Sequence, residues 1–270
     1  MEWFQAIILG LVQGLTEFLP VSSSGHLAIG REILGVDAGD DIMFDVVLHT
    51  ATVLATIIVF RKQILQLLRG LFKFKWNDET DYILKICVSM IPVFVVGMFF
   101  KDSVEKLFSS FLVVGVALVV TALLLFFSDR PSLRERRRPD GPAPRNGISW
   151  IQAFIVGLGQ AVAVVPGLSR SGTTISTGLL CGMKRSDVAQ FSFLMVLVPI
   201  LGEAFLDLVG GDLAASSVGA VPMVLGFLAA FVSGLFACKV MVALVKKAKL
   251  KWFALYCAIV GLAVILYCVL

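Results

Sequence analysis

Long apolar stretches constrain this chain more than any other feature of its sequence. A helix needs about 20 apolar residues to cross the hydrocarbon core of a bilayer. Hydrophobic residues make up 58% of the 270-residue chain and charged residues 16%, which excludes a water-soluble enzyme and a nucleic-acid-binding protein with a basic groove. The sequence therefore predicts an all-α, multi-pass protein that lies in a lipid bilayer. Six stretches approach the length of a span: 43–60, 80–100, 111–128, 188–209, 218–245 and 252–270.

Two further apolar regions are interrupted near their middle. The first, at about 2–36, is broken by Pro20 and by three consecutive serines. The second, at about 148–183, is broken by Pro166-Gly167 and by Ser169-Arg170-Ser171-Gly172. The second arm of each region is too short to span a bilayer. Both regions are therefore predicted to be re-entrant helical hairpins, because broken backbone at membrane depth must be buried in protein or face water.

Lysine and arginine are concentrated in four segments between the apolar stretches. Segment 61–76 holds five, segment 129–146 holds six, 184–185 holds two and 246–251 holds four, together 17 of the 23 in the chain. Loops rich in these residues stay in the cytoplasm. When all four are placed there, six spans and two hairpins thread consistently, and both chain ends are expected outside.

The two interrupted regions align with each other at a shift of 147 residues. Each predicted hairpin is followed by three spans, and because three is odd, the second copy enters the membrane from the opposite side. The sequence therefore predicts an inverted repeat, with a first repeat at 1–128, a cytoplasmic linker at 129–146 and a second repeat at 147–270. A site is expected where the two breaks meet. The identical positions are Ala6, Ile8, Gly10, Leu11, Gln13, Ser22, Ser24 and Gly25, which match Ala153, Ile155, Gly157, Leu158, Gln160, Ser169, Ser171 and Gly172.

The breaks also carry ionisable residues, which are costly inside a bilayer and therefore indicate function. The first break offers Glu17 and His26, and the second offers Arg170. A guanidinium group pairs phosphate oxygens two at a time. A helix that begins just after Gly25 or Gly172 would point its positive end at the same anion, and glycine amides can form an anion nest. The residues expected to surround a bound phosphate are Ser22, Ser23, Ser24, Gly25, Ser169, Ser171, Gly172, Thr173 and Thr174.

Each of these residues also has a structural interpretation. Arg170 and Glu17 could form an ion pair without a ligand, and the serines could cap helices at the breaks. His26 could be a helix-packing residue. Asp45 and His49 lie four residues apart on one helix face, and they are interpreted as an interfacial pair at the outer start of a span.

The sequences of the two breaks resemble the signatures of a known family. The stretch Gln13-Gly14-Leu15-Thr16-Glu17-Phe18-Leu19-Pro20-Val21-Ser22-Ser23-Ser24-Gly25-His26 is similar to the first signature of the bacterial undecaprenyl-diphosphate phosphatase family, also called the bacitracin-resistance family. The stretch Pro166-Gly167-Leu168-Ser169-Arg170-Ser171-Gly172-Thr173-Thr174 is similar to the second. Length, hydropathy and motif order also match, so the resemblance covers essentially the whole chain.

The resemblance implies a reaction and a location. The family hydrolyses undecaprenyl diphosphate to undecaprenyl phosphate and inorganic phosphate at the outer face of the bacterial inner membrane. This reaction recycles the lipid carrier of cell-wall synthesis and confers resistance to bacitracin. A polyprenyl diphosphate is therefore the expected substrate, and the sequence leaves open whether the protein forms a homodimer.

The resemblance also implies roles for individual residues. Glu17, Ser23, His26 and Arg170 fall on the family's catalytic positions, and Glu17 is expected to bind Mg²⁺ or Ca²⁺. Some members carry a second glutamate where this chain has Gln13, so the expected cation bridges Glu17 and the diphosphate. Two residues remain candidates for the nucleophile. Ser23 is one, with His26 as its base and Glu17 orienting the imidazole, and His26 itself is the other.

A membrane transporter is the alternative function. Many secondary transporters share inverted repeats and broken helices, and an anion carrier would also use Arg170 and His26. The cluster of Ser23, His26 and Glu17 favours a phosphatase, because transport does not require a nucleophile beside a base.

Overall fold

The computed structural model describes residues 1–36, 42–100, 104, 106–107, 110–129, 145–210, 218–247 and 249–270. For residues 42, 145, 203–210 and 245–247 it describes the backbone only. Every regular element within these ranges is helical. The predicted all-α class is therefore confirmed.

Six of the helices are long and apolar enough to cross a membrane, as predicted. The predicted end of the first span is wrong, because its helix continues through most of the basic segment 61–76. Leucine, glutamine, lysine and arginine dominate that segment and all favour helix. The six helices are α3 (Ile42–Leu71), α4 (Asp78–Phe99), α6 (Phe111–Ser128), α10 (Arg185–Gly210), α11 (Ala220–Lys247) and α12 (Lys251–Val269).

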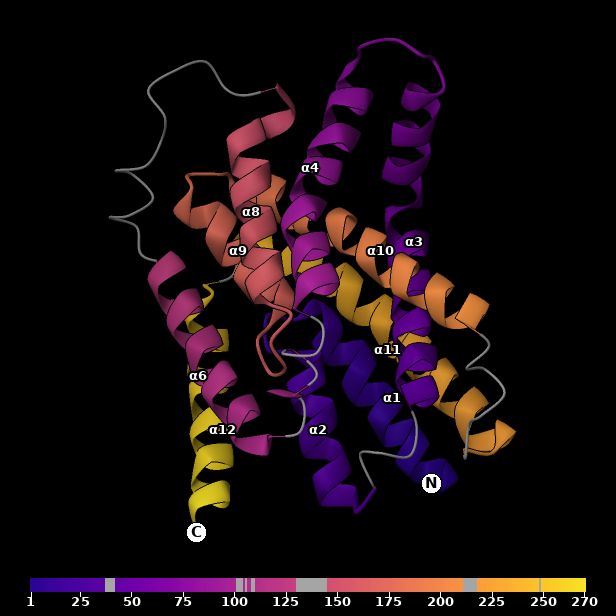
Figure 1. Ribbon diagram of the computed structural model, residues 1–270, viewed down its shortest axis with the longest axis vertical. Helices are drawn as coiled ribbons and strands as arrows, with labels where there is room; N and C mark the ends of the chain where they lie inside the picture. The colour runs from indigo at the N-terminus through magenta and orange to yellow at the C-terminus, as the bar shows by residue number, and fades with distance from the viewer. Residues whose placement is uncertain are drawn as a thin grey trace.

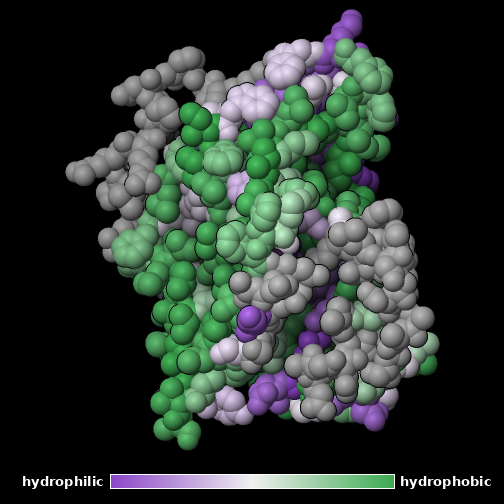
Figure 2. Space-filling model, in the orientation of Figure 1, coloured by the Kyte–Doolittle hydropathy of each residue, from purple (hydrophilic) through white to green (hydrophobic). Residues whose placement is uncertain are grey.

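Large apolar side chains point outward from these helices. On α12, for example, Ile259, Leu262 and Leu266 are 58–60% exposed. Figure 2 shows apolar residues over most of the left side of one face, and hydrophilic residues at its top and in its lower part. Such an extended apolar surface marks contact with lipid, which agrees with six membrane spans.

Four shorter helices form the two interrupted regions. The first region contains α1 (Trp3–Phe18) and α2 (Ser23–Leu34), and the second contains α8 (Trp150–Val162) and α9 (Arg170–Leu180), preceded by the turn η1 (Arg145–Gly147). They have 11 to 16 residues each, which is less than a span requires. In Figure 1, α1 and α2 lie in the lower half and α8 and α9 in the upper half, and both termini lie at the lower edge. Re-entry from opposite sides remains a prediction, with which this arrangement agrees. The limits of the repeats are also untested, and residues 130–144 of the predicted linker lie outside the described residues.

Serine side chains decide where α2 and α9 begin. The Ser22 hydroxyl accepts a hydrogen bond from the Gly25 amide at 3.2 Å, and the Ser169 hydroxyl accepts one from the Gly172 amide at 3.0 Å. Each cap satisfies one of the free N–H groups of a first turn. The helices therefore start before the two glycines, not just after them as predicted, and these two amides are not free to bind an anion.

Small residues allow each hairpin to approach a spanning helix closely. A Cβ atom on Gly14 of α1 would lie 2.0 Å from Ser233 Oγ of α11, and one on Gly157 of α8 would lie 2.3 Å from the Ser89 carbonyl oxygen of α4. Helices in lipid associate through such close packing, because no hydrophobic force drives them together. The pairs α1–α11 and α8–α4 are equivalent under the predicted 147-residue shift.

Candidate active site

The two breaks touch each other, as the sequence predicted. The Gly167 amide donates to Ser24 Oγ at 3.4 Å, and Ser171 Oγ donates to the Leu19 carbonyl oxygen at 3.1 Å. Gly167 has a φ of +84°, and a Cβ there would lie 2.7 Å from the backbone of Val114. Only glycine fits this crossing. The fold thus brings both signature motifs to one place.

A cavity opens where α1, α3, α9 and α10 meet. Glu17 from the first break and Arg170 from the second both line it. Its apolar side includes Phe18 and Phe193, whose rings lie 6.2 Å apart. The cavity therefore joins a carboxylate and a guanidinium in an apolar setting. Its polar lining consists of Glu17, Thr52, Thr56, Arg170, Ser171 and Ser192.

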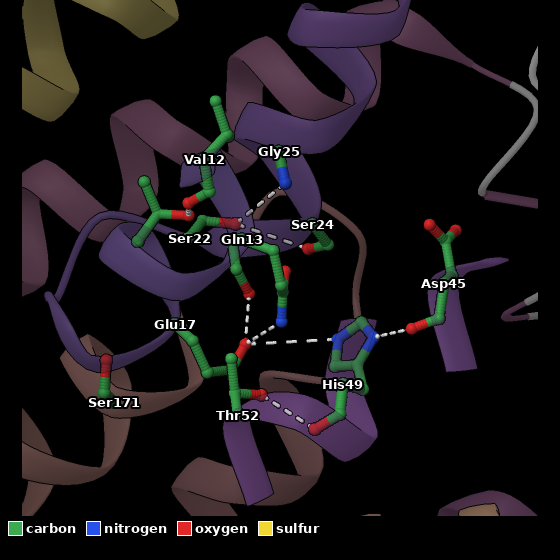
Figure 3. A network of polar contacts seen from close by, with 12 residues as sticks. Val12, Gln13, Glu17, Ser22, Ser24, Gly25, Asp45, His49, Thr52 and Ser171 are labelled. Carbon is green, nitrogen blue, oxygen red and sulfur yellow. Dashed lines mark hydrogen bonds and ion pairs between the residues drawn. The ribbon is translucent and has the colours of Figure 1, made fainter. Parts of the chain in front are cut away.

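Glu17 is the centre of the polar network in Figure 3. Its Oε2 atom accepts hydrogen bonds from Ser23 Oγ at 2.6 Å and from Gln13 Nε2 at 3.0 Å, and it lies 3.9 Å from His49 Nε2. The Glu17 side chain is only 9% exposed, so its charge has to be matched by polar partners. The Ser23 hydroxyl is aimed at this carboxylate, which is the geometry of a nucleophile beside a general base.

The network includes His49, which sequence reasoning placed elsewhere. The interpretation of Asp45 and His49 as an interfacial side-chain pair is wrong. The Asp45 carboxylate pairs with Arg31, whereas His49 Nδ1 donates to the Asp45 carbonyl oxygen at 2.9 Å and Nε2 faces Glu17. A histidine within an apolar span was the signal that could have revealed it.

His26 points away from Glu17. Its Nδ1 atom lies 2.7 Å from the Ser22 carbonyl oxygen and its Nε2 atom lies 2.7 Å from the hydroxyl of Tyr256 on α12. Both ring nitrogens are therefore engaged. The expected arrangement, in which Glu17 orients His26 and His26 activates Ser23, is not the one observed.

The remaining predicted residues divide into two groups. Ser171 lines the cavity. Ser22 and Ser169 cap helices, and the Thr174 hydroxyl donates to the Arg170 carbonyl oxygen at 2.9 Å. The Thr173 hydroxyl is buried and has no hydrogen-bond partner among the described residues. Most of the expected phosphate-binding hydroxyls therefore shape the loops instead of facing the cavity.

Sequence reasoning also missed the contributions of two spans to the cavity. Thr52 and Thr56 come from α3, and Ser192 comes from α10. The Ser192 hydroxyl is fully buried, and no described residue hydrogen-bonds to it. Threonine and serine are common in membrane helices, so their presence alone gave no signal.

The donor atoms near Glu17 fit a divalent cation that is shared with a ligand. In the described part of the chain, no group of three or more His, Cys, Asp or Glu side chains could hold a metal. Gln13 Oε1, however, is buried without a hydrogen-bond partner among the described residues, while its amide nitrogen contacts Glu17. Carboxylate and carboxamide oxygens both suit Mg²⁺ and Ca²⁺. For such an ion the chain would supply two oxygen ligands, and a bound substrate would have to supply the others.

Comparisons with known proteins agree on one family. The family model described as bacitracin resistance protein BacA matches residues 6–263. A protein named undecaprenyl-diphosphatase from Parabacteroides distasonis is 54% identical over 269 residues, and one from Bacteroides fragilis is 52% identical over 269 residues, each alignment covering 98% of both chains. An undecaprenyl-diphosphatase from Methanococcus vannielii is 40% identical over 264 residues, which cover 97% of this chain and 98% of that protein.

Proposed function

This chain belongs to the BacA family of bacitracin resistance proteins, and we propose that it is an integral membrane phosphatase acting on undecaprenyl diphosphate. The products are undecaprenyl phosphate and inorganic phosphate. The reaction recycles the lipid carrier for peptidoglycan synthesis and thereby confers resistance to bacitracin. The observation that carries the proposal is the hydrogen bond from Ser23 to Glu17, at 2.6 Å, beside a cavity that Glu17 shares with Arg170.

Ser23 is the proposed nucleophile. Its Oγ attacks the terminal phosphorus while Glu17 accepts the hydroxyl proton, and the bond from that phosphorus to the bridging oxygen breaks. Glu17 passes that proton to the leaving oxygen, undecaprenyl phosphate departs, and a phosphoserine remains. The regenerated Glu17 carboxylate then takes a proton from a water molecule, whose oxygen attacks the phosphoserine phosphorus. The bond from phosphorus to Ser23 Oγ breaks, inorganic phosphate leaves, and Glu17 returns the proton to Ser23 Oγ.

Arg170 is the proposed electrostatic partner of the diphosphate. Phosphoryl transfer depends mainly on positioning and on offsetting the charge of the equatorial and leaving oxygens. Arg170 is the first residue of α9 and lines the same cavity as Glu17. Its guanidinium fork and the positive end of that helix can therefore act on one anion.

A divalent cation is proposed to assist substrate binding. Glu17 and Gln13 Oε1 would hold Mg²⁺ or Ca²⁺ together with diphosphate oxygens. Such an ion would offset phosphate charge. The unpartnered, buried amide oxygen of Gln13 supports this assignment.

The active site is proposed to open on the outer side of the bacterial inner membrane. The support is the concentration of lysine and arginine in segments that would then all be cytoplasmic. Six apolar helices make the protein multi-pass.

Phosphate release by the purified protein in detergent tests the proposed function. We expect the wild type to release phosphate from undecaprenyl diphosphate, to lose activity in EDTA and to recover it with Mg²⁺ or Ca²⁺. Arg170→Ala should be folded and nearly inactive. A folded wild type that releases no phosphate under any cation condition would exclude the phosphatase, and flux assays in liposomes would then test transport.

Trapping the phospho-enzyme identifies the nucleophile. Phosphoserine survives acid and phosphohistidine does not. The engaged ring nitrogens of His26 favour Ser23, so we expect an acid-stable adduct that maps to Ser23. An acid-labile adduct on His26 would overturn the assignment.

A further inference from the structure

We infer that Tyr256 is a positioning residue for Ser23, acting through His26 and Ser22. The inference rests on the proposed function, in which Ser23 is the nucleophile. Tyr256 lies on α12, far in sequence from both signature motifs. The contacts that connect it to Ser23 run through the His26 imidazole and the Ser22 carbonyl group.

The backbone directly before Ser23 is strained. Ser22 has a φ of 72° and a ψ of 101°, a region that residues other than glycine rarely occupy. Such a conformation persists only when its surroundings hold it in place. Ser22 is buried, and the chain passes from it straight into the first residue of α2. Its conformation therefore sets the direction of Ser23 and the 2.6 Å contact with Glu17.

His26 holds the Ser22 carbonyl group. That oxygen lies 3.2 Å from the His26 amide nitrogen and 2.7 Å from its Nδ1 atom. A carbonyl oxygen can only accept, so Nδ1 carries the hydrogen and the neutral ring presents Nε2 as an acceptor. The imidazole thus fixes the strained peptide from the side that faces α12.

Tyr256 in turn holds the imidazole. Its hydroxyl donates to His26 Nε2 at 2.7 Å, and the two rings stack with centroids 5.5 Å apart and planes 11° apart. The neighbouring Cys257 thiol lies 3.6 Å from the Pro20 carbonyl oxygen. Two consecutive residues of α12 therefore contact the first break, and the contacts from Tyr256 through His26 end at the peptide before Ser23.

A second tyrosine on α12 provides a matched control. The Tyr267 hydroxyl donates to Glu32 Oε1 at 2.9 Å, near the end of α2 that is remote from Ser22. Tyr→Phe at either position keeps the ring and removes one hydrogen bond between the same two helices. Only the change at Tyr256 is connected to Ser23.

Steady-state kinetics of these two variants test the inference. We expect Tyr256→Phe to lower kcat about fivefold, in line with the loss of one hydrogen bond, while KM and thermal stability match those of Tyr267→Phe. Tyr267→Phe should keep kcat within about twofold of the wild type. A Tyr256→Phe enzyme with the kcat of the wild type or of Tyr267→Phe would overturn the inference.

Substitution of Ser22 tests whether Tyr256 acts by holding the Ser22 backbone or by stabilising the protein as a whole. Ser22→Gly and Ser22→Ala both remove the hydroxyl cap, but only glycine adopts a positive φ without support. The effect of Tyr256→Phe on kcat should nearly vanish in the Ser22→Gly background and stay about fivefold in the Ser22→Ala background. Equal effects in both backgrounds would refute the inference. An inactive wild type would instead refute the proposed function, so the two failures are distinguishable.

Discussion

At the scale of single residues, one carboxylate oxygen organises the site. Glu17 Oε2 accepts hydrogen bonds from the Ser23 hydroxyl and the Gln13 side-chain amide, and it faces the His49 imidazole. These partners come from both arms of the first hairpin and from a spanning helix. The chemistry therefore depends on how α1, α2 and α3 are held together.

Removal of the Ser23 hydroxyl should abolish turnover. We expect Ser23→Ala to lower phosphate release by about a thousandfold or more, because loss of a nucleophile removes the covalent route. Ser24→Ala is the neighbouring control, since that hydroxyl accepts from the Gly167 amide and does not contact Glu17. It should lose far less activity. Equal losses in the two variants would argue against Ser23 as the nucleophile.

Glu17 and His49 should be energetically coupled. The contact between Nε2 and the carboxylate, which is an ion pair when the imidazole is protonated, is lost in His49→Gln, in Glu17→Gln and in the double variant alike. The change in the free energy of unfolding of the double variant should therefore differ from the sum of the two single changes. The difference, the coupling free energy, should be about 0.5–3 kcal/mol and is measured by thermal unfolding. Additive effects would mean that the 3.9 Å approach contributes nothing to stability.

The sequence predicted some of these residues and could not predict others. Glu17, Ser23 and Arg170 stand in local signatures, so their importance can be recognised before any fold is known. His49 and Tyr256 enter through α3 and α12. Their neighbours depend on where helices distant in sequence cross, and that crossing is set by side-chain packing.

At the scale of elements, the breaks in the two apolar regions could be predicted from the sequence, whereas the first residues of α2 and α9 could not. Proline and serine-rich runs are local signals for a break. The starts depend on which hydroxyl caps the first turn, and Ser22 and Ser169 cap earlier than expected. The extent of α3 was missed because its basic end is amphipathic, while a spanning window detects only apolar runs.

The contact between α1 and α11 should tolerate no added methyl group at Gly14. A Cβ there would meet Ser233 Oγ at 2.0 Å, whereas a Cβ on Gly97 of α4 would meet nothing within 4 Å. We expect Gly14→Ala to destabilise the protein by about 1–3 kcal/mol. Gly97→Ala should stabilise it by about 0.5–1 kcal/mol. Thermal unfolding in detergent checks both, and a stable Gly14→Ala variant would contradict the close packing.

At the scale of the whole molecule, hydropathy was sufficient to predict six spans. Hydropathy could not predict which spans pack against each other, because lipid-facing and buried apolar residues look alike in sequence. In Figure 1 the turn between α3 and α4 lies at the opposite end of the molecule from both termini. That geometry makes the predicted topology open to a direct test.

Cysteine labelling in intact cells checks the orientation. In a cysteine-free background, Phe74→Cys in the basic turn should react with an impermeant maleimide only after the cells are opened, since basic loops stay in the cytoplasm. Ile33→Cys, at the other end of the molecule, should react in intact cells. These side chains are 89% and 78% exposed, so neighbouring protein atoms do not cover them. The reverse pattern would invert the topology.

The contact between His26 and Tyr256 has a consequence for the synthesis and membrane insertion of the protein. Ser23, the proposed nucleophile, is translated well before Tyr256, the residue inferred to support it. At about 5–20 residues per second, translation separates them by roughly 10 to 50 s. During that interval the first hairpin also lacks α11, against which Gly14 packs. We therefore expect the site to be complete only once α11 and α12 have entered the membrane. A ribosome that stalls before α12 should leave a chain that has both signatures but an incomplete site.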